Sequence, residues 1–294
     1  MDINGKTKFA AILGNPVGHS LSPVMHNTFF QLLKMNYAYI PFEIDAEKLD
    51  KGVEGLWNLG FIGANITIPF KEKIIKYLVG ISPEARLIGA VNTLVRKDNG
   101  FWGENTDGKG FLRALKQEKE FTPQGKRVVV LGAGGSARAV CITLALDGAE
   151  KITIVNRSLA KGKEIGRVIE KEIGVGAKIA GWEDKGLKTL IQEGELIVNT
   201  TPLGMKPNVM GLPPLNTQWL TKDQLVVDII YSPLETRFLK EAAQQGCQTQ
   251  NGLGMLINQG LLAFEKWTGV IPPAEEIRKI LQKQLALEES NNRC

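Results

Sequence analysis

The sequence predicts an α/β protein with two doubly wound domains followed by a helical segment. Runs rich in Val and Ile alternate with helical patterns along most of the 294 residues, a length that accommodates two domains. A polar stretch at residues 116–126 interrupts the alternation, which then restarts. From residue 252 onward, apolar residues recur at helical spacing. We therefore expect domains at residues 1–107 and 108–251, and helices over residues 252–294 that pack back toward the first domain.

The first domain is expected to alternate strands with helices. An apolar run at residues 9–13 indicates a strand, and Ser22-Pro23 opens a helix that we expect to reach about residue 35, because proline suits the first helical turn. The sequence Asp98-Asn99-Gly100 predicts a hairpin turn. Further strands are expected at residues 38–44, 60–68, 90–97 and 101–105, with helical stretches at residues 46–59 and 70–78.

The second domain repeats this alternation after residue 126. Because its strands are again separated by turns or helices, we expect a mainly parallel sheet. A hinge between the domains is expected near residues 107–126 and again near Asn251. The strands are expected at residues 127–132, 152–157, 177–181, 195–201 and 225–230.

Composition narrows the classes of function. The net charge of +5 is mild and its Lys and Arg residues are dispersed, which argues against a nucleic-acid surface and favours small anionic ligands. The chain has no leader-like start, and its longest apolar stretch contains Arg138, so we expect a cytoplasmic protein without a membrane partner. The three cysteines lack paired spacing and the two histidines lack companion ligands, so no metal site is expected. The assembly state stays open, a homodimer included.

Residues 65–73, NITIPFKEK, combine a strand with an unusual polar end. Alternation places Ile66 and Ile68 on one buried face, and Asn65 and Thr67 on the other. Proline then ends the hydrogen-bonded ladder, and Lys71 follows the turn. A half-exposed edge strand with a solvated lysine would give the same pattern.

Other polar side chains occur at comparable positions. Ser20 and Ser22 flank a loop-to-helix junction whose hydroxyls and amides suit a carboxylate, while Asn92 begins a strand and Asp107 precedes a helix. Ser22 and Asp107 would serve equally well as helix N-caps. Because ligands of open α/β sheets bind at the ends of the strands, we expect these residues to face one crevice.

RVVVLGAGGSARA is the sharpest local signal. A strand leads into the spacing G-x-G-x-x-A, in which Gly132 permits a tight turn, Gly134 admits a diphosphate and Ala137 keeps the following helix close. The N-terminus of that helix favours phosphate. The pattern predicts a Rossmann-type dinucleotide-binding domain.

The next strand indicates which dinucleotide is bound. It ends in Asn156-Arg157-Ser158, with Lys161 one helical turn further, where an NAD site usually has an acidic residue. A guanidinium can hold the 2′-phosphate of NADP through two contacts, whereas a carboxylate would repel it. Ser158 as an N-cap with solvated basic neighbours is the alternative, but it does not explain the missing acid. NADP is therefore the expected cofactor.

Together these motifs resemble the shikimate dehydrogenase family. The resemblance runs from about residue 9 to residue 267 and implies NADPH-dependent, reversible reduction of 3-dehydroshikimate to shikimate in the pathway to aromatic amino acids. It makes residues 1–107 a substrate-binding domain and residues 108–251 the NADP domain. The matching motifs are SLSP, NITIPFKE, GAVNT, NTDG, GAGGSARA, NRS, NTTPLGM, DIIYSP and GLGMLINQ.

The resemblance also implies individual roles. Lys71 and Asp107 would be the catalytic pair, and Ser20 and Ser22 would hold the substrate carboxylate. The substrate hydroxyls would be contacted by Asn65, Thr67, Asn92, Tyr231 and Gln259. The cofactor would lie on Gly132, Ala133, Gly134, Gly135 and Ser136, with its ribose phosphate near Asn156, Arg157, Ser158 and Lys161, and its nicotinamide half near Thr200, Ile229 and Gly252.

This pair suits ketone reduction. The developing alkoxide needs a proton, and a lysine side chain carries one at neutral pH. A neighbouring aspartate stabilises and orients the ammonium group.

The chain departs from the family at a few positions. The usual GAGGA turn and NRT motif carry Ser136 and Ser158 here, small changes that leave phosphate contacts in place. Glu84 is the acidic residue nearest to one that some members carry before the GAVNT strand, and it receives no role. Three alternatives remain: a quinate/shikimate dehydrogenase that uses NAD, a non-catalytic nicotinamide-binding regulator, and another two-domain reductase. Arg157 argues against the first, the retained catalytic pair against the second, and the paired serines against a large substrate.

Overall fold

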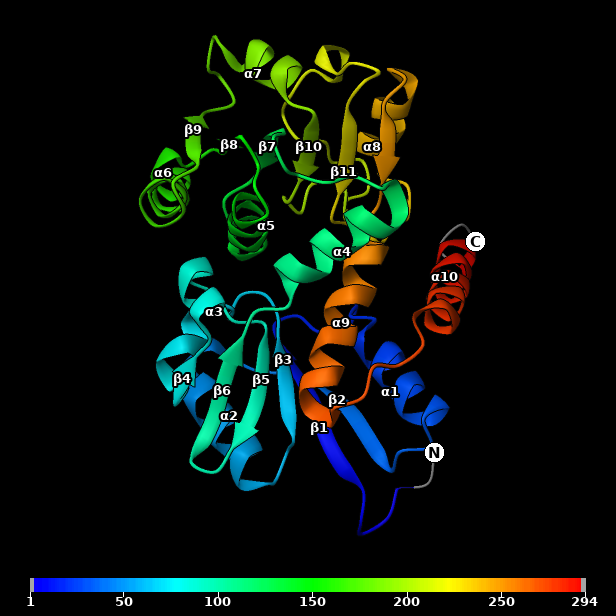
Figure 1. The fold of residues 1–294 in the computed structure, drawn as a ribbon. Helices are drawn as coiled ribbons and strands as arrows, with labels where there is room; N and C mark the ends of the chain where they lie inside the picture. The colour runs from blue at the N-terminus through cyan, green and yellow to red at the C-terminus, as the bar shows by residue number, and fades with distance from the viewer. Residues whose placement is uncertain (1–2, 292–294) are drawn as a thin grey trace. The chain divides into compact units, whose positions relative to one another are not determined.

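The computed structural model describes residues 3–291, with side chains through residue 287. The described chain divides into two compact units. The first contains the residues up to Asp107 together with Ile257–Gln284, and the second contains Gly108–Leu256 and the described residues from Leu285 onward. Figure 1 shows the strands of each unit as a separate sheet, so the predicted class of two α/β sheets is confirmed.

The first unit contains a mixed six-stranded sheet in the order β2-β1-β3-β5-β6-β4. β1 pairs in parallel with β2 and β3, whereas β5 runs antiparallel to both β3 and β6. The predicted hairpin at residues 98–100 is thus confirmed as the β5–β6 connection. The strands are β1 (Lys8–Gly14), β2 (Tyr37–Glu43), β3 (Gly63–Ile66), β4 (Gly80–Ile81), β5 (Thr93–Lys97) and β6 (Gly100–Glu104).

Helices cover both faces of this sheet (Figure 1). On one face, Leu49, Val53 and Leu56 of α2 pack on the apolar residues of β1, β3 and β5. On the other face, Phe264 of α9 contacts Phe29 of α1, with 5.4 Å between ring centroids. The helical elements are α1 (Ser22–Leu32), η1 (Ala46–Lys48), α2 (Leu49–Asn58), η2 (Lys73–Tyr77), α3 (Pro83–Ile88) and α9 (Leu253–Thr268), whose first turn belongs to the second unit.

The second unit contains six parallel strands in the order β12-β11-β10-β7-β8-β9. β7 lies at the centre and the chain winds outward from it in both directions, which is the strand order of doubly wound dinucleotide-binding domains. The strands are β7 (Arg127–Leu131), β8 (Lys151–Val155), β9 (Gly176–Ala180), β10 (Leu196–Asn199), β11 (Leu225–Asp228) and β12 (Gln248–Gln250).

The helices of the second unit cover its sheet. Leu187 and Ile191 of α7 and Phe238 of α8 form one core with the strands. The helical elements not yet given bounds are α4 (Asp107–Lys119), α5 (Gly135–Leu146), α6 (Leu159–Val168), the π-helical η3 (Ile169–Ile173), α7 (Leu187–Glu193), η4 (Thr217–Trp219), α8 (Arg237–Gln244) and α10 (Ala274–Asn291). Most of α10 falls in the first unit.

Two of the local predictions were wrong, and the alternative interpretation of Ser22 as an N-cap does not hold. β3 ends at Ile66, and Ile68 is 60% exposed, because proline at position 69 stops the ladder before Ile68 joins the buried face. Residues 116–119 are the last turn of α4 rather than linker. Ser22 is the first residue of α1 and makes no N-cap hydrogen bond, since the cap position falls on Leu21.

Candidate active site

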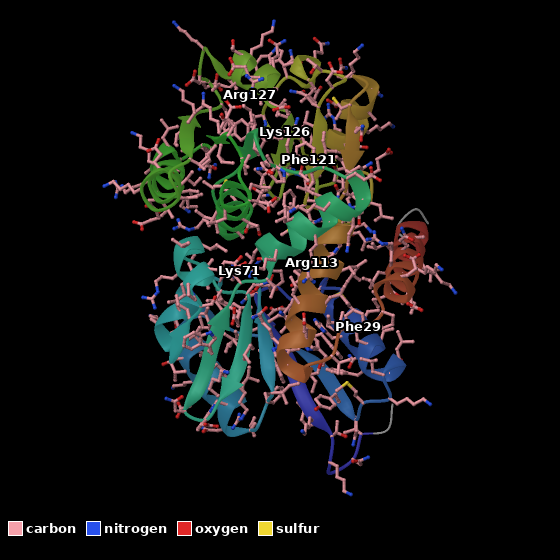
Figure 2. The ribbon with its side chains drawn as sticks, viewed as in Figure 1. Phe29, Lys71, Arg113, Phe121, Lys126 and Arg127 are labelled. Atoms are coloured by element: carbon pink, nitrogen blue, oxygen red, sulfur yellow. The ribbon has the colours of Figure 1, made fainter. Side chains whose placement is uncertain are left out.

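The catalytic pair predicted from the sequence is formed in the first unit. The Nζ atom of Lys71 donates to Oδ2 of Asp107 at 2.6 Å. Lys71 follows the end of β3, and its backbone carbonyl accepts a hydrogen bond from the Val91 amide at 2.8 Å. Asp107 is the first residue of α4, where the helix dipole favours a negative charge. Lys71, labelled in Figure 2, keeps 15% of its side-chain surface exposed, and Asp107 keeps 7%.

Asn92 supports the aspartate. Its Nδ2 atom donates to Asp107 Oδ1 at 2.8 Å and to Thr106 Oγ1 at 2.9 Å, and Gln259 Oε1 lies farther away at 3.4 Å. An amide nitrogen carries two hydrogens, so the two shorter contacts use both. The Asn92 oxygen accepts from the Thr106 amide at 2.8 Å. The structure therefore gives Asn92 a supporting role, and its contact with substrate stays a prediction.

Strand register explains why these residues meet. Asn65 lies opposite Thr93 in the β3–β5 pair, and Thr93 lies opposite Glu104 in the β5–β6 pair. Asn92 precedes β5 and Asp107 follows β6, so both lie at the end of the sheet where β3 ends. Asn65 Nδ2 donates to the Asn92 carbonyl at 3.2 Å and to Thr93 Oγ1 at 3.3 Å.

Tyr39 joins this network from β2. Its hydroxyl donates to Asn65 Oδ1 at 2.6 Å. Asn65 then has both hydrogens used and one acceptor lone pair left, which suits a hydroxyl group of the substrate. Burial raises the pKa of Tyr39 well above its ordinary value, and the Ser22 side chain opposes this through a hydrogen bond. Ser20 Oγ in turn accepts from the Ser22 amide at 3.2 Å.

Thr67 lies near this network without a side-chain hydrogen bond to it among the described residues. Its amide donates to the Leu13 carbonyl at 2.9 Å. A Cβ atom on Gly14 would collide with the Thr67 methyl group, so the glycine leaves room for this side chain. His26 packs behind Tyr39, with 4.5 Å between ring centroids, and burial lowers its pKa to about 3, which keeps the imidazole neutral.

The second unit contains the predicted phosphate cradle at the end of β7. Gly132 has φ +115°, and a Cβ atom there would meet Thr200 Oγ1 at 2.5 Å, so only glycine fits this turn. Gly134 precedes α5, and nothing lies within 4 Å of the position its Cβ atom would take. The cradle is completed by Ala133, Gly135 and Ser136. This open backbone before a helix N-terminus fits a diphosphate.

The basic residues that follow β8 lie beside this cradle in the sheet. The Gly132 amide donates to the Val155 carbonyl at 2.8 Å, which places Asn156 next to the turn. Asn156 Nδ2 donates to the Ser158 carbonyl at 2.9 Å and shapes the loop. Arg157 and Lys161 are exposed and form no ion pair with a described residue, so both are available to an anionic group.

The residues predicted for the nicotinamide half also belong to the second unit. Thr200 Oγ1 donates to the Leu131 carbonyl at 2.7 Å, which fixes it behind Gly132. A Cβ atom on Gly252 would collide with the Ile229 carbonyl, so close backbone packing alone requires this glycine. Tyr231, which was predicted to contact the substrate, is half-buried in the segment after β11 of the same unit. The predicted roles of these residues toward ligands stay predictions.

Several residues of the site were missed by sequence reasoning. Tyr39 looked like an ordinary strand residue, and its partner Asn65 is distant in sequence. Thr106 and Asn105 lie inside the NTDG motif, but Asp107 was the one member of that motif that was predicted to have a role. Asp228 is fully buried and accepts hydrogen bonds from Asn199, Thr236 and the Ile230 amide. The DIIYSP motif was the available signal for it.

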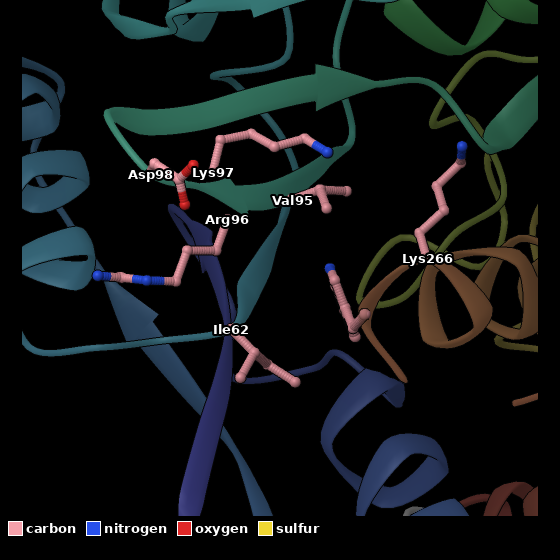
Figure 3. Close-up of a pocket in the computed structure, with 7 residues that line it drawn as sticks. Ile62, Val95, Arg96, Lys97, Asp98 and Lys266 are labelled. Atoms are coloured by element: carbon pink, nitrogen blue, oxygen red, sulfur yellow. The ribbon is translucent and has the colours of Figure 1, made fainter. Parts of the chain in front are cut away.

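A pocket of about 600 Å³ in the first unit lies apart from these residues (Figure 3). Lys97 and Lys266 are its exposed cations, and Lys266 already pairs with Glu104 at 3.2 Å. None of the residues that line it was predicted to bind substrate, and we assign it no role. Its lining consists of Ile62, Val95, Arg96, Lys97, Asp98, Lys266 and Trp267.

Residues 3–291 were also compared with the requirements of a metal site and of a membrane span. This part of the chain brings together no group of three or more His, Cys, Asp or Glu side chains placed to hold a metal ion. Each of its helices is too short or too polar to span a lipid bilayer.

Comparison with known proteins gives one consistent result. Residues 12–94 match the shikimate dehydrogenase substrate binding domain, residues 114–203 match shikimate / quinate 5-dehydrogenase, and residues 252–282 match the shikimate 5′-dehydrogenase C-terminal domain. The NADP(+) shikimate dehydrogenase of Desulforamulus reducens is 45% identical over 97% of this chain and 98% of its own.

Solved structures agree. A shikimate dehydrogenase in complex with NADP+ superposes with a TM-score of 0.90 at 40% identity, covering 97% of this chain and 98% of that one. Shikimate 5-dehydrogenase from Listeria monocytogenes, in complex with shikimate and NAD, gives a TM-score of 0.89 at 39% identity, covering 96% and 98%.

Proposed function

The chain belongs to the shikimate dehydrogenase family, and we propose that it catalyses the NADPH-dependent, reversible reduction of 3-dehydroshikimate to shikimate in the pathway to aromatic amino acids. The observation that carries this proposal is the 2.6 Å pair between Lys71 and Asp107, held within a network of buried amides and hydroxyls. A surface lysine would not need such a setting.

Lys71 is the proposed acid and base. When bound, NADPH supplies the hydride for the substrate ketone. The ammonium group of Lys71 gives its proton to the oxygen that develops negative charge. Asp107 holds the amine in one direction and stabilises its charged form, and the amide of Asn92 keeps the carboxylate from rotating. In the oxidative direction the neutral amine accepts the proton.

The network around the pair is proposed to bind a small polyhydroxylated acid. Ser20 and Ser22 would hold the substrate carboxylate at the start of α1. Asn65, with its one remaining acceptor lone pair, would receive a hydrogen bond from a ring hydroxyl. Thr67, Tyr231 and Gln259 would make the remaining contacts.

The second unit is proposed to bind NADP. Gly132–Ser136 would hold the diphosphate, and Arg157 and Lys161 would pair with the 2′-phosphate, aided by Asn156 and Ser158. Thr200, Ile229 and Gly252 would border the nicotinamide half. The open cradle at Gly134 and the two exposed cations support this assignment.

A panel of two substrates and two cofactors tests the function. With purified protein, shikimate and NADP+ should give the highest kcat/KM, and quinate or NAD+ should give much lower values. A chain that oxidises quinate with NAD+ best would instead be a quinate dehydrogenase. Absence of turnover with all four combinations, in a protein that still binds NADPH, would favour a non-catalytic regulator.

We further propose that the enzyme works in the cytoplasm. Cys141 and Cys247 are free thiols, as is usual for proteins of a reducing compartment. A homodimer stays a prediction, which sedimentation of the purified chain would test.

A further inference from the structure

We propose that Asn105 is a positioning residue that sets the geometry of the Lys71–Asp107 pair. This inference rests on the proposed function of that pair and adds a residue to it. Asn105 is 3% exposed and lies two positions before Asp107, between β6 and α4. It would not touch the substrate, and it acts through the backbone on either side of the pair.

The contacts of Asn105 connect two separate segments. Its Oδ1 atom accepts from the Asp107 amide at 3.0 Å, and its Nδ2 atom donates to the Ala90 carbonyl at 2.9 Å. The next amide along, that of Val91, donates to the Lys71 carbonyl at 2.8 Å. One side chain therefore joins the backbone that carries Asp107 to the segment that holds Lys71.

Both ends of the pair depend on this connection. Without Asn105, the Asp107 amide at the start of α4 would lose its acceptor, and the segment around Ala90 would lose a donor. Asn92, which belongs to the same segment, would then aim its amide at Asp107 less accurately. Since proton transfer requires close placement, a displacement of about 1 Å should lower turnover about 10- to 100-fold.

Two variants distinguish the two hydrogen bonds of the Asn105 side chain, one to Ala90 and one from Asp107. Asn105→Ala removes both hydrogen bonds. Asn105→Ser retains an oxygen that can accept from the Asp107 amide two residues on, but it is too short to reach Ala90. We expect kcat to fall in the order wild type, Ser, Ala, with KM for shikimate nearly unchanged.

Gln224→Ala is the matched control. Gln224 is also 3% exposed and joins backbone segments, since its Nε2 atom donates to the carbonyls of Ile191 and Gly194, both at 2.6 Å. It precedes β11, at the end of the sheet opposite the phosphate cradle. This variant should lose stability and keep kcat. Equal kcat in the Asn105→Ala and Gln224→Ala enzymes would overturn the proposal, as would a raised KM with normal kcat.

A double-mutant cycle shows whether Asn105 acts through Asp107. Asn105→Ser should reduce kcat in the wild-type background and have little further effect beside Asp107→Asn. Additive losses would contradict the proposal. The crystal structure of Asn105→Ser gives an answer independent of turnover: the Lys71 Nζ to Asp107 Oδ2 separation should lengthen from 2.6 Å by up to about 1 Å, beyond the usual range of a charge-assisted hydrogen bond. An unchanged pair would refute the positioning role, whereas a displaced pair in a chain without shikimate activity would refute the proposed function alone.

Discussion

At the scale of single residues, the site depends on amides whose hydrogen bonds are nearly all used within the protein. Asn92 has both hydrogens engaged, and Asn65 retains a single acceptor lone pair. Such saturation fixes the orientation of each side chain before substrate arrives, because a rotated amide would leave buried polar atoms without partners. The site is therefore preorganised around Lys71.

Arg157 is the residue that should select the cofactor. Arg157→Ala removes a charge-assisted contact with the 2′-phosphate, so NADPH affinity should fall by roughly 1.5–3 kcal/mol while NADH affinity changes little. Fluorescence titration with both cofactors measures this difference. Arg167→Ala is the control, because Arg167 is also exposed and lies near the end of α6, the helix that begins two residues after Arg157. Equal losses for NADPH and NADH would show that Arg157 does not recognise the phosphate.

At the scale of elements, strand ends decide where functional side chains lie. The sequence predicted the β7–Gly132–α5 turn and the β5–β6 hairpin correctly, because glycine spacing and turn residues are local signals. It could not predict that Tyr39 of β2 reaches Asn65 of β3, since that contact depends on the order of strands in the sheet. Ile68 was assigned to a buried face on alternation alone, which continued the strand past its true end.

Asp228 accepts hydrogen bonds from the segment after β11 and from Asn199. Its titration should change the free energy of unfolding. Burial raises its pKa from 3.8 to about 6, although Ile230, Thr236 and Asn199 all donate to the carboxylate. Between about pH 4 and pH 6 the folded chain keeps a proton that the unfolded chain has released. The free energy of unfolding should therefore fall as pH rises through this window, by roughly 3 kcal/mol in total.

Calorimetry of the wild type and Asp228→Asn checks this effect. The variant has no carboxyl group at this position, so its thermal midpoint should lack this contribution. The wild-type midpoint minus that of the variant should decrease from pH 4 to about pH 6 and then stay level. Parallel pH profiles of the two proteins would show that Asp228 titrates normally.

At the scale of the whole molecule, the boundaries between the two units fall within helices. The boundary after Asp107 falls in the first turn of α4, and the boundary at Ile257 falls within α9. The expected hinge at residues 107–126 was inferred from polar composition, yet part of that composition belongs to the exposed face of α4, whose other face buries Phe111 and Leu115.

The fold class was predictable because strand and helix periodicity persists throughout the chain. The Lys71–Asp107 pair was identified through family resemblance, since 36 residues separate its members and no local spacing joins them. Asn105 escaped notice for a physical reason: asparagine is common in turns, and its donor to Ala90 becomes evident only when β5 and β6 are paired.

The central claim is that Lys71 transfers the proton in shikimate dehydrogenation, and the kcat of Lys71→Ala with shikimate and NADP+ tests it most directly. Loss of the positioned group that accepts the hydroxyl proton should lower kcat by about 10²–10⁴, while the dissociation constant for NADPH stays close to that of the wild type. A Lys71→Ala enzyme that retains near-normal turnover would contradict the account and make Lys71 an ordinary lysine at the end of a strand.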